Sequence, residues 1–200
     1  MMMKCDKKNI KTLAAVLIRK FLELKDASKQ VWSKMTNEFK VSIKTNVLKA
    51  IINEQERSVK FNFCDTIAQV AENIYDADDE DQTEEFNDLI EYLFGIFSQN
   101  NINESHTLEI EAALVILAKV FGFIYNKLNN KMDVLVNAFR MYFKSNNMNL
   151  RTKSTEAVTE ILALVSKKDA KKFKEFMFYI LETCLKCMEN PKEESNVISF

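Results

Sequence analysis

The chain has 200 residues, of which 47% are hydrophobic and 28% charged, and its formal net charge is −1. This much apolar material is enough for a substantial core, and the near-neutral charge argues against direct binding of nucleic acid or of anionic membranes. Only two glycines and one proline occur, against averages of roughly 7% and 5%. Because β-hairpins need such turn formers, the composition predicts an all-α protein.

Apolar residues recur at helical spacing along most of the chain. Their period predicts eight helices, at approximately residues 9–24, 36–53, 56–75, 83–98, 104–125, 129–145, 149–165 and 169–188. Thr36 is a suitable N-cap for the second helix, and Glu38 places a favourable negative charge in its first turn. In the third helix, an apolar stripe at spacings of four, three and four residues contains Phe63, Ile67, Val70 and Ile74.

The fifth predicted helix contains the longest apolar stretch, residues 112–125, which Lys119 interrupts. A membrane-spanning helix needs about 20 apolar residues. This stretch is shorter and carries a charge, so we expect a buried helix and no membrane insertion.

The predicted helices group into hairpins: the second with the third, the fourth with the fifth and the sixth with the seventh. Their starts recur every roughly 40–47 residues, which is typical of HEAT repeats and longer than the roughly 34-residue period of tetratricopeptide repeats. We therefore predict a right-handed α-solenoid of HEAT/armadillo-like hairpins over residues 1–190, followed by a flexible tail, 191–200. The first and eighth helices have no mates, so we expect the chain to be a segment of a longer solenoid.

Two charged segments interrupt the apolar pattern. Residues 76–81, DADDED, are a solvated connector in the simpler interpretation, with Asp81 and Glu84 forming a capping box for the fourth helix. The alternative is an acidic patch that attracts a basic partner. Residues 167–172, KKDAKK, favour a solvated helix start over a nucleic-acid site, because no aromatic residues are interleaved with the lysines.

The residues that could carry chemistry are few. Cys184 and Cys187 form a lone CxxC, which without a second ligand pair favours packing on the inner side of the eighth helix over zinc or redox chemistry. The single histidine, His106, begins a polar helix turn and has no nucleophile or carboxylate partner in the pattern of a catalytic triad. We expect a protein that is not an enzyme and that uses no metal or cofactor.

Segments 13–22, LAAVLIRKFL, and 59–74, VKFNFCDTIAQVAENI, followed by the acidic segment and by Glu85-Phe86, resemble HEAT repeats of the importin-β (karyopherin-β) family. The order of a Cys-Asp pair, an Ala/Val-rich helix, an acidic loop and an aromatic-rich helix is most similar to the karyopherin beta-3 (importin-5) branch. The resemblance identifies the chain as an N-terminal HEAT-repeat segment of a nuclear transport receptor.

The resemblance implies a receptor that shuttles between cytoplasm and nucleus through the nuclear pore. Its expected partners are Ran-GTP, cargo proteins with basic import signals and Phe-Gly nucleoporins. The third predicted helix directs polar side chains away from its apolar stripe, towards the side that faces partners in this family. The predicted Ran- or cargo-facing residues are Arg19, Lys60, Asp65, Gln69 and Glu72.

Phe61 lies on the same side of the third helix. It either contacts a partner or packs against a neighbouring repeat. The alternative functions are another HEAT scaffold, such as a phosphatase regulatory subunit or a chromosome-organising protein, and a helical repeat protein that binds RNA. The last would need a recurring set of base-reading side chains, and none is found in the sequence.

Overall fold

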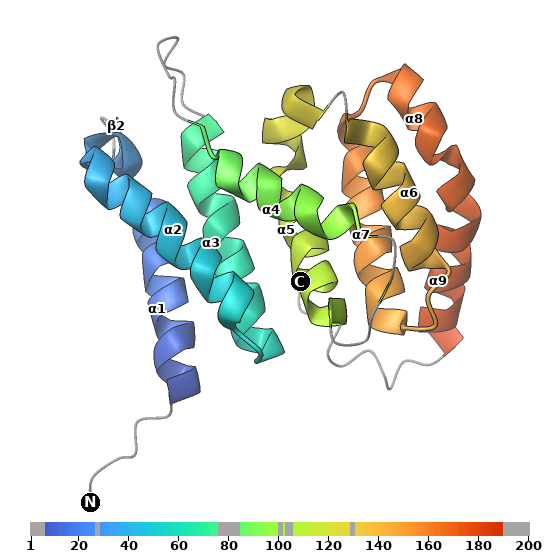
Figure 1. Ribbon diagram of the computed structural model, residues 1–200, viewed down its shortest axis with the longest axis horizontal. Coiled ribbons are helices and arrows are strands. Elements are labelled where there is room, and N and C mark those ends of the chain that lie inside the picture. The colour runs from blue at the N-terminus through green and yellow to red at the C-terminus, as the bar shows by residue number, and fades with distance from the viewer. Residues whose placement is uncertain are drawn as a thin grey trace, which may run out of the picture. The chain divides into compact units, whose positions relative to one another are not determined.

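The computed structural model describes residues 7–26, 29–75, 85–99, 102, 106–128 and 131–189. It contains α1 (Lys7–Leu22), β1 (Lys25–Asp26), β2 (Lys29–Gln30), the 3-10 helix η1 (Val31–Lys34), α2 (Asn37–Asn53), α3 (Arg57–Tyr75), α4 (Asn87–Phe97), α5 (Thr107–Leu128), α6 (Met132–Phe143), α7 (Met148–Leu164), α8 (Lys167–Phe173), the 3-10 helix η4 (Lys174–Phe176) and α9 (Met177–Glu189) (Figure 1). The chain divides into two compact units, unit 1 (Met1–Leu93) and unit 2 (Phe94–Phe200).

The prediction of helical structure is confirmed over these described ranges. Seven of the eight predicted helices are present with ends shifted by a few residues, and Thr36 caps α2 by accepting a hydrogen bond from the Phe39 amide (3.4 Å). The predicted acidic segment 76–81, the capping pair Asp81 and Glu84, and the tail 191–200 lie outside the described residues.

The eighth predicted helix is wrong as a single element, because η4 separates α8 from α9. Side chains three residues apart lie on one side of a 3-10 helix. Phe173 and Phe176 are spaced in this way, are both fully buried, and contact each other with ring centroids 6.1 Å apart. Phe139 of α6 contacts both rings, at 6.2 and 6.0 Å. Burial of this pair against α6 accounts for the tighter turn.

In unit 1, α3 packs against both α1 and α2. The predicted stripe of α3, from Phe63 to Ile74, is buried. The connection of three residues between α2 and α3 makes the two helices an antiparallel hairpin, as predicted.

The segment between α1 and α2 was not anticipated. Its two short strands pair antiparallel, Lys25 with Gln30 and Asp26 with Lys29. The following 3-10 helix buries Trp32, and the ammonium group of Lys40 lies 5.6 Å from the centre of the indole ring. This cation–π contact fastens the connection to the first turn of α2.

Helices α1 and α3 run parallel. Four hydrogen bonds, spread from the amino ends to the carboxyl ends of both helices, join Lys8 to Glu56, Ala15 to Thr66, Arg19 to Asp65, and Leu22 to Asn73. The paired residues are 46 to 51 positions apart. The second helices of neighbouring hairpins therefore stack directly, at a period close to the one predicted from helix starts.

Unit 2 repeats this arrangement: α7 packs against α5 and against α6. An aromatic cluster centred on Phe139 fills the space beside α8 and η4. Its ring contacts join Phe97, Tyr142, Phe143, Phe173, Phe176 and Tyr179. The predicted pairing of the sixth with the seventh helix is thus confirmed, and that of the fourth with the fifth stays a prediction. Among the described helices, none combines the length and the low charge that crossing a bilayer requires.

Candidate functional site

One side of the parallel pair α1 and α3 carries a row of polar side chains. We call it the α1–α3 surface and define it by Arg19, Glu23, Asp65, Gln69 and Glu72. The α3 members follow one another at spacings of four and three residues, so they share a helix face opposite to the buried stripe. All five side chains are half-buried. Four of the five predicted partner-facing residues belong to this surface.

Hydrogen bonds and ion pairs hold the α1–α3 surface in place. Arg19 donates from Nη1 to Asp65 Oδ2 (2.9 Å), and its Nε lies 3.4 Å from Glu23 Oε1. Gln69 Nε2 donates to Glu72 Oε2 (3.0 Å). Three carboxylates against the single guanidinium leave this row acidic, although Lys20 also pairs with Glu23 (2.9 Å). Electrostatic complementarity favours basic groups at an acidic row of this kind.

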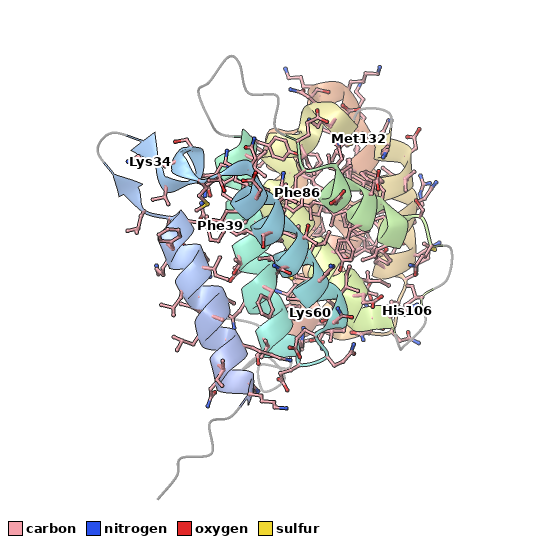
Figure 2. All side chains as sticks on the ribbon, turned by 60° about the vertical axis from the view of Figure 1, so that its left-hand side comes forward. Lys34, Phe39, Lys60, Phe86, His106 and Met132 are labelled. Atoms are coloured by element: carbon pink, nitrogen blue, oxygen red, sulfur yellow. The ribbon has the colours of Figure 1, made fainter. Side chains whose placement is uncertain are left out.

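The fifth predicted residue, Lys60, lies off this surface, and the sequence prediction for it is wrong. It is fully buried on α3, where Figure 2 labels it. Lys60 precedes Phe63 by three residues and Ile67 by seven, so it continues the apolar stripe instead of the polar face. Helical spacing alone could have shown this, because the predicted stripe already fixed which side of α3 faces the core.

Phe61 is partly covered. The guanidinium of Arg57 lies 5.2 Å from the centre of its ring, one turn earlier on the same helix. The ring thus has an intramolecular contact and keeps some exposure, and its role towards a partner or a neighbouring repeat stays a prediction.

Two polar residues missed by the sequence analysis join α1 to α3 beneath the surface. Thr66 donates from Oγ1 to the Ala15 carbonyl (3.1 Å), and Asn73 donates from Nδ2 to the Leu22 carbonyl (3.2 Å), near the end of α1. Both side chains are buried. Each directly precedes a residue of the apolar stripe in the sequence. Because buried polar groups are nearly always hydrogen-bonded, a polar residue at such a position indicates a specific hydrogen-bond partner in the core.

Glu54, in the loop between α2 and α3, contacts the amino-terminal part of α1 and the start of α3. Its Oε1 accepts hydrogen bonds from the amides of Gln55 and Glu56, both at 3.0 Å, and its Oε2 accepts one from Lys11 Nζ at 2.6 Å. The hydrogen bond from Lys11 lowers the pKa of Glu54, although burial acts to raise it. Neighbouring hairpins are therefore held together at this end by a charge-assisted hydrogen bond.

The histidine and the CxxC cysteines lie on separate elements, His106 before α5 and Cys184 and Cys187 on α9. His106 is exposed immediately before α5, as predicted. The predicted core packing of the CxxC is wrong, because Cys184 is exposed and Cys187 half-buried on α9. Within the described ranges, no three histidine, cysteine or acidic side chains gather closely enough to hold a metal ion.

Unit 2 has an open polar cavity of about 480 Å³ between α6 and the α8–η4 segment. Four of its charged side chains form two ion pairs: Arg140 with Glu175 at 2.7 Å, and Lys172 with Asp133 at 2.8 Å. The lysines of segment 167–172 begin α8, as the simpler interpretation predicted. Lys171 also lines the cavity, so three cationic side chains stand against two carboxylates, and both carboxylates are already held in the two ion pairs.

Stacked helical hairpins that present side-chain surfaces define the class of this protein: an α-helical repeat protein. The family model described as "IPO5-like, TPR repeats" matches residues 55–200. The chain belongs to this family, which confirms the importin-β resemblance predicted from the sequence. The separation of 46 to 51 residues between α1 and α3 contacts is longer than a tetratricopeptide period.

Solved structures of Kap121p have the same fold. A crystal structure of Kap121p bound to Nup53p is similar with a TM-score of 0.66 and 18% identity, over 96% of this chain and 16% of that chain. Kap121p bound to Pho4p gives the same TM-score and identity, over 96% and 17%. A structure described simply as Kap121p gives 0.59 and 16% identity, over 94% and 18%. The chain thus spans about a sixth of the solved proteins, and the likeness confirms the α-solenoid fold class.

Proposed function

We propose that this chain is a protein-binding segment of an importin-type nuclear transport receptor, which shuttles between cytoplasm and nucleus. Its role is binding, without catalysis, and the α1–α3 surface contacts a basic import signal of a cargo protein or Ran-GTP. The observation that carries this proposal is the acidic row on α1 and α3 in a chain of the IPO5-like family.

The chemistry of the row supports a basic partner. Asp65 and Glu72 have their carboxylates on the side of α3 that faces away from the core. Arg19 already shows how a guanidinium binds there, at 2.9 Å from Asp65. A lysine or arginine of a partner can make the same charge-assisted contact. The Kap121p structures in complex with Nup53p and Pho4p add that relatives of this fold bind proteins, and we propose cargo and Phe-Gly nucleoporins as partners here.

The test is a binding titration of the full 200-residue chain. The ligands are a peptide with a basic import signal, Ran loaded with GTP, and Ran loaded with GDP. We expect the peptide to bind with an affinity that falls as salt rises, and Ran to bind only in its GTP form. Failure to bind both the peptide and Ran-GTP contradicts the proposal.

A matched pair of variants locates the binding site. Asp65→Asn with Glu72→Gln removes two negative charges from the α1–α3 surface. Asp88→Asn with Glu91→Gln removes two charges from exposed positions on α4. We expect the first pair to weaken peptide binding about tenfold or more, and the second to change it less than about twofold. Equal effects of the two pairs would place the binding elsewhere.

A further inference from the structure

The cavity between α6 and the α8–η4 segment of unit 2 is lined by side chains of both elements. Its α6 wall contains Asp133, Val136, Asn137 and Arg140, which lie on one face of the helix because they follow one another at helical spacing. The rise from Asp133 to Arg140 is about 10 Å. The volume of about 480 Å³ lies within the range found for ligand sites in proteins. We call it the α6–α8 cavity.

Each nitrogen of the Arg140 guanidinium donates to a neighbour in the cavity. Nε and Nη2 donate to Glu175 Oε1, at 3.0 and 2.7 Å, and Nε also lies 3.1 Å from Glu175 Oε2. The third nitrogen, Nη1, donates to Asn137 Oδ1 at 2.8 Å. The acceptor atom of the Asn137 side chain is therefore engaged, and its remaining polar group is the Nδ2 donor.

The α6–α8 cavity contains hydrogen-bond donors that have no partner. Asn137 Nδ2 and Lys171 Nζ make no hydrogen bond or ion pair with the residues that the structure describes. Lys172 gives one of its three ammonium hydrogens to Asp133, at 2.8 Å. Both carboxylates of the cavity are held by a cation, whereas no carboxylate in the described ranges holds Lys171. The cavity therefore presents free donors and one unbalanced positive charge.

Free donors and an excess positive charge favour an acidic ligand. Two features of the cavity favour a peptide segment over a single small anion. An extended peptide rises about 3.3 Å per residue, so about three residues match the length of the α6 wall. Val136 forms an apolar part of this wall, where it is 5% exposed, and can contact the methylene groups of a glutamate side chain.

We propose that the α6–α8 cavity binds a glutamate-rich segment of a partner protein, whose carboxylates accept hydrogen bonds from Lys171 Nζ and Asn137 Nδ2. The ion pair between Arg140 and Glu175 is exposed and contributes little to stability, so a ligand carboxylate can compete with Glu175 for the guanidinium. The charge preference of this site is opposite to that of the α1–α3 surface. This inference is independent of the proposed transport function, which concerns the α1–α3 surface of unit 1.

Fluorescence anisotropy of the full 200-residue chain tests the ligand class. The probes are labelled peptides of about six residues that carry either glutamates or, at the same positions, glutamines. We expect the glutamate peptide to bind with a dissociation constant of about 1 mM or lower, and the glutamine peptide to bind at least about tenfold more weakly. Equal binding of the two peptides, or no binding of the glutamate peptide, overturns the proposal.

Inorganic phosphate tests whether the cavity instead binds small anions. Phosphate is added at the dissociation constant of the glutamate peptide and at constant ionic strength, and we expect the peptide to stay bound. Displacement of the peptide would show a site for small anions and overturn the proposal.

Two variants with opposite expected effects locate the binding site. Lys171→Glu reverses the charge of the unpaired cation, and we expect the glutamate peptide to bind at least about fivefold more weakly. Glu175→Gln releases the Arg140 guanidinium, and we expect the peptide to bind about two- to fivefold more tightly. Both positions are exposed, so the fold is retained.

The matched control is Lys49→Glu, which makes the same change of charge at an exposed position on α2, outside the cavity. It should change the dissociation constant less than about twofold. Equal losses for Lys171→Glu and Lys49→Glu overturn the proposal, as does a Glu175→Gln variant that binds no more tightly than the wild type. If Lys171→Glu loses the helical circular dichroism of the wild type, Lys171→Gln and Lys49→Gln provide the same comparison.

Discussion

The Lys11 ammonium group donates a hydrogen bond of 2.6 Å to the Glu54 carboxylate, 43 residues further along the chain. Lys11 lies on α1 and Glu54 in the loop that joins α2 to α3. The pair therefore connects one hairpin to the next, while the same carboxylate accepts two amide hydrogen bonds at the start of α3.

Replacing Glu54 should destabilise unit 1. Glu54→Ala removes three hydrogen bonds at a buried position, and we expect the free energy of unfolding to fall by about 1–3 kcal/mol. Lys11→Met should cost less than about 1 kcal/mol, because the lysine side chain is 53% exposed and its charge is screened by water. Urea unfolding followed by the fluorescence of Trp32 measures both. Glu91→Ala, at an exposed position, is the control and should stay within about 0.5 kcal/mol.

The same carboxylate makes stability depend on pH. Its pKa is lowered from 4.5, chiefly by the hydrogen bond from Lys11. Glu54 therefore contributes stability above about pH 4.5, and this contribution is lost as the pH falls through the lower pKa of the folded state. The urea midpoint of the wild type should fall more steeply between pH 5 and pH 3 than that of Glu54→Gln, as estimated from the linkage relation. If the urea midpoints of the wild type and Glu54→Gln changed with pH in the same way, Glu54 would not be the source of this pH dependence.

Tyr142→Phe should make unit 2 at least as stable as it is in the wild type. The Tyr142 hydroxyl is buried and has no hydrogen-bond partner among the described residues, and burial raises its pKa. Removing an unsatisfied buried hydroxyl should increase the free energy of unfolding by about 0–1 kcal/mol. Tyr125→Phe is the matched control: it loses a 2.7 Å hydrogen bond to Asp169 and should destabilise unit 2 by about 1 kcal/mol. Thermal unfolding followed by circular dichroism distinguishes the two.

Chemical labelling can check the burial of Lys60. An amine-reactive reagent should modify Lys60 at least about tenfold more slowly than the exposed Lys49, because the buried amine reacts only when α3 opens locally. Mass spectrometry of tryptic peptides gives both rates. Equal modification rates for Lys60 and Lys49 would show that the Lys60 amine is accessible to solvent.

The aromatic cluster of unit 2 should depend on Phe139. Phe139→Ala removes a fully buried ring that contacts Phe173 and Phe176, and should cost about 3–5 kcal/mol. Phe178→Ala, at a ring that is 71% exposed, should change stability by less than about 0.5 kcal/mol. Urea unfolding monitored by circular dichroism compares them, and similar losses for both would contradict the central position of Phe139.

Patterns within single helices predicted most of the helices correctly. Contacts between residues distant in sequence account for most of the differences between the predicted and the observed structure. The stripe from Phe63 to Ile74 and the cap at Thr36 depend on residues within one helix, so spacing and residue type were sufficient. The break at η4 depends on where Phe173 and Phe176 meet Phe139, more than 30 residues earlier.

The α1–α3 surface also combines features that one helix determines with features that depend on contacts between helices. Asp65, Gln69 and Glu72 follow from the face of one helix. Their pairing with Arg19 needs the register between α1 and α3, which no single-helix pattern contains. Cys184 was misplaced because its burial depends on what covers the outer side of α9.

The first turn of α1 has lysines and no acidic residue, although the amino end of a helix carries partial positive charge from its aligned peptide dipoles. Parallel packing brings the amino end of α3 to the same edge. Glu54 and Glu56, paired with Lys11 and Lys8, supply the negative charge that α1 itself lacks. The carboxylates in the loop between α2 and α3 therefore offset the partial positive charge at the amino end of α1. As an isolated peptide, α1 should fray from its amino end.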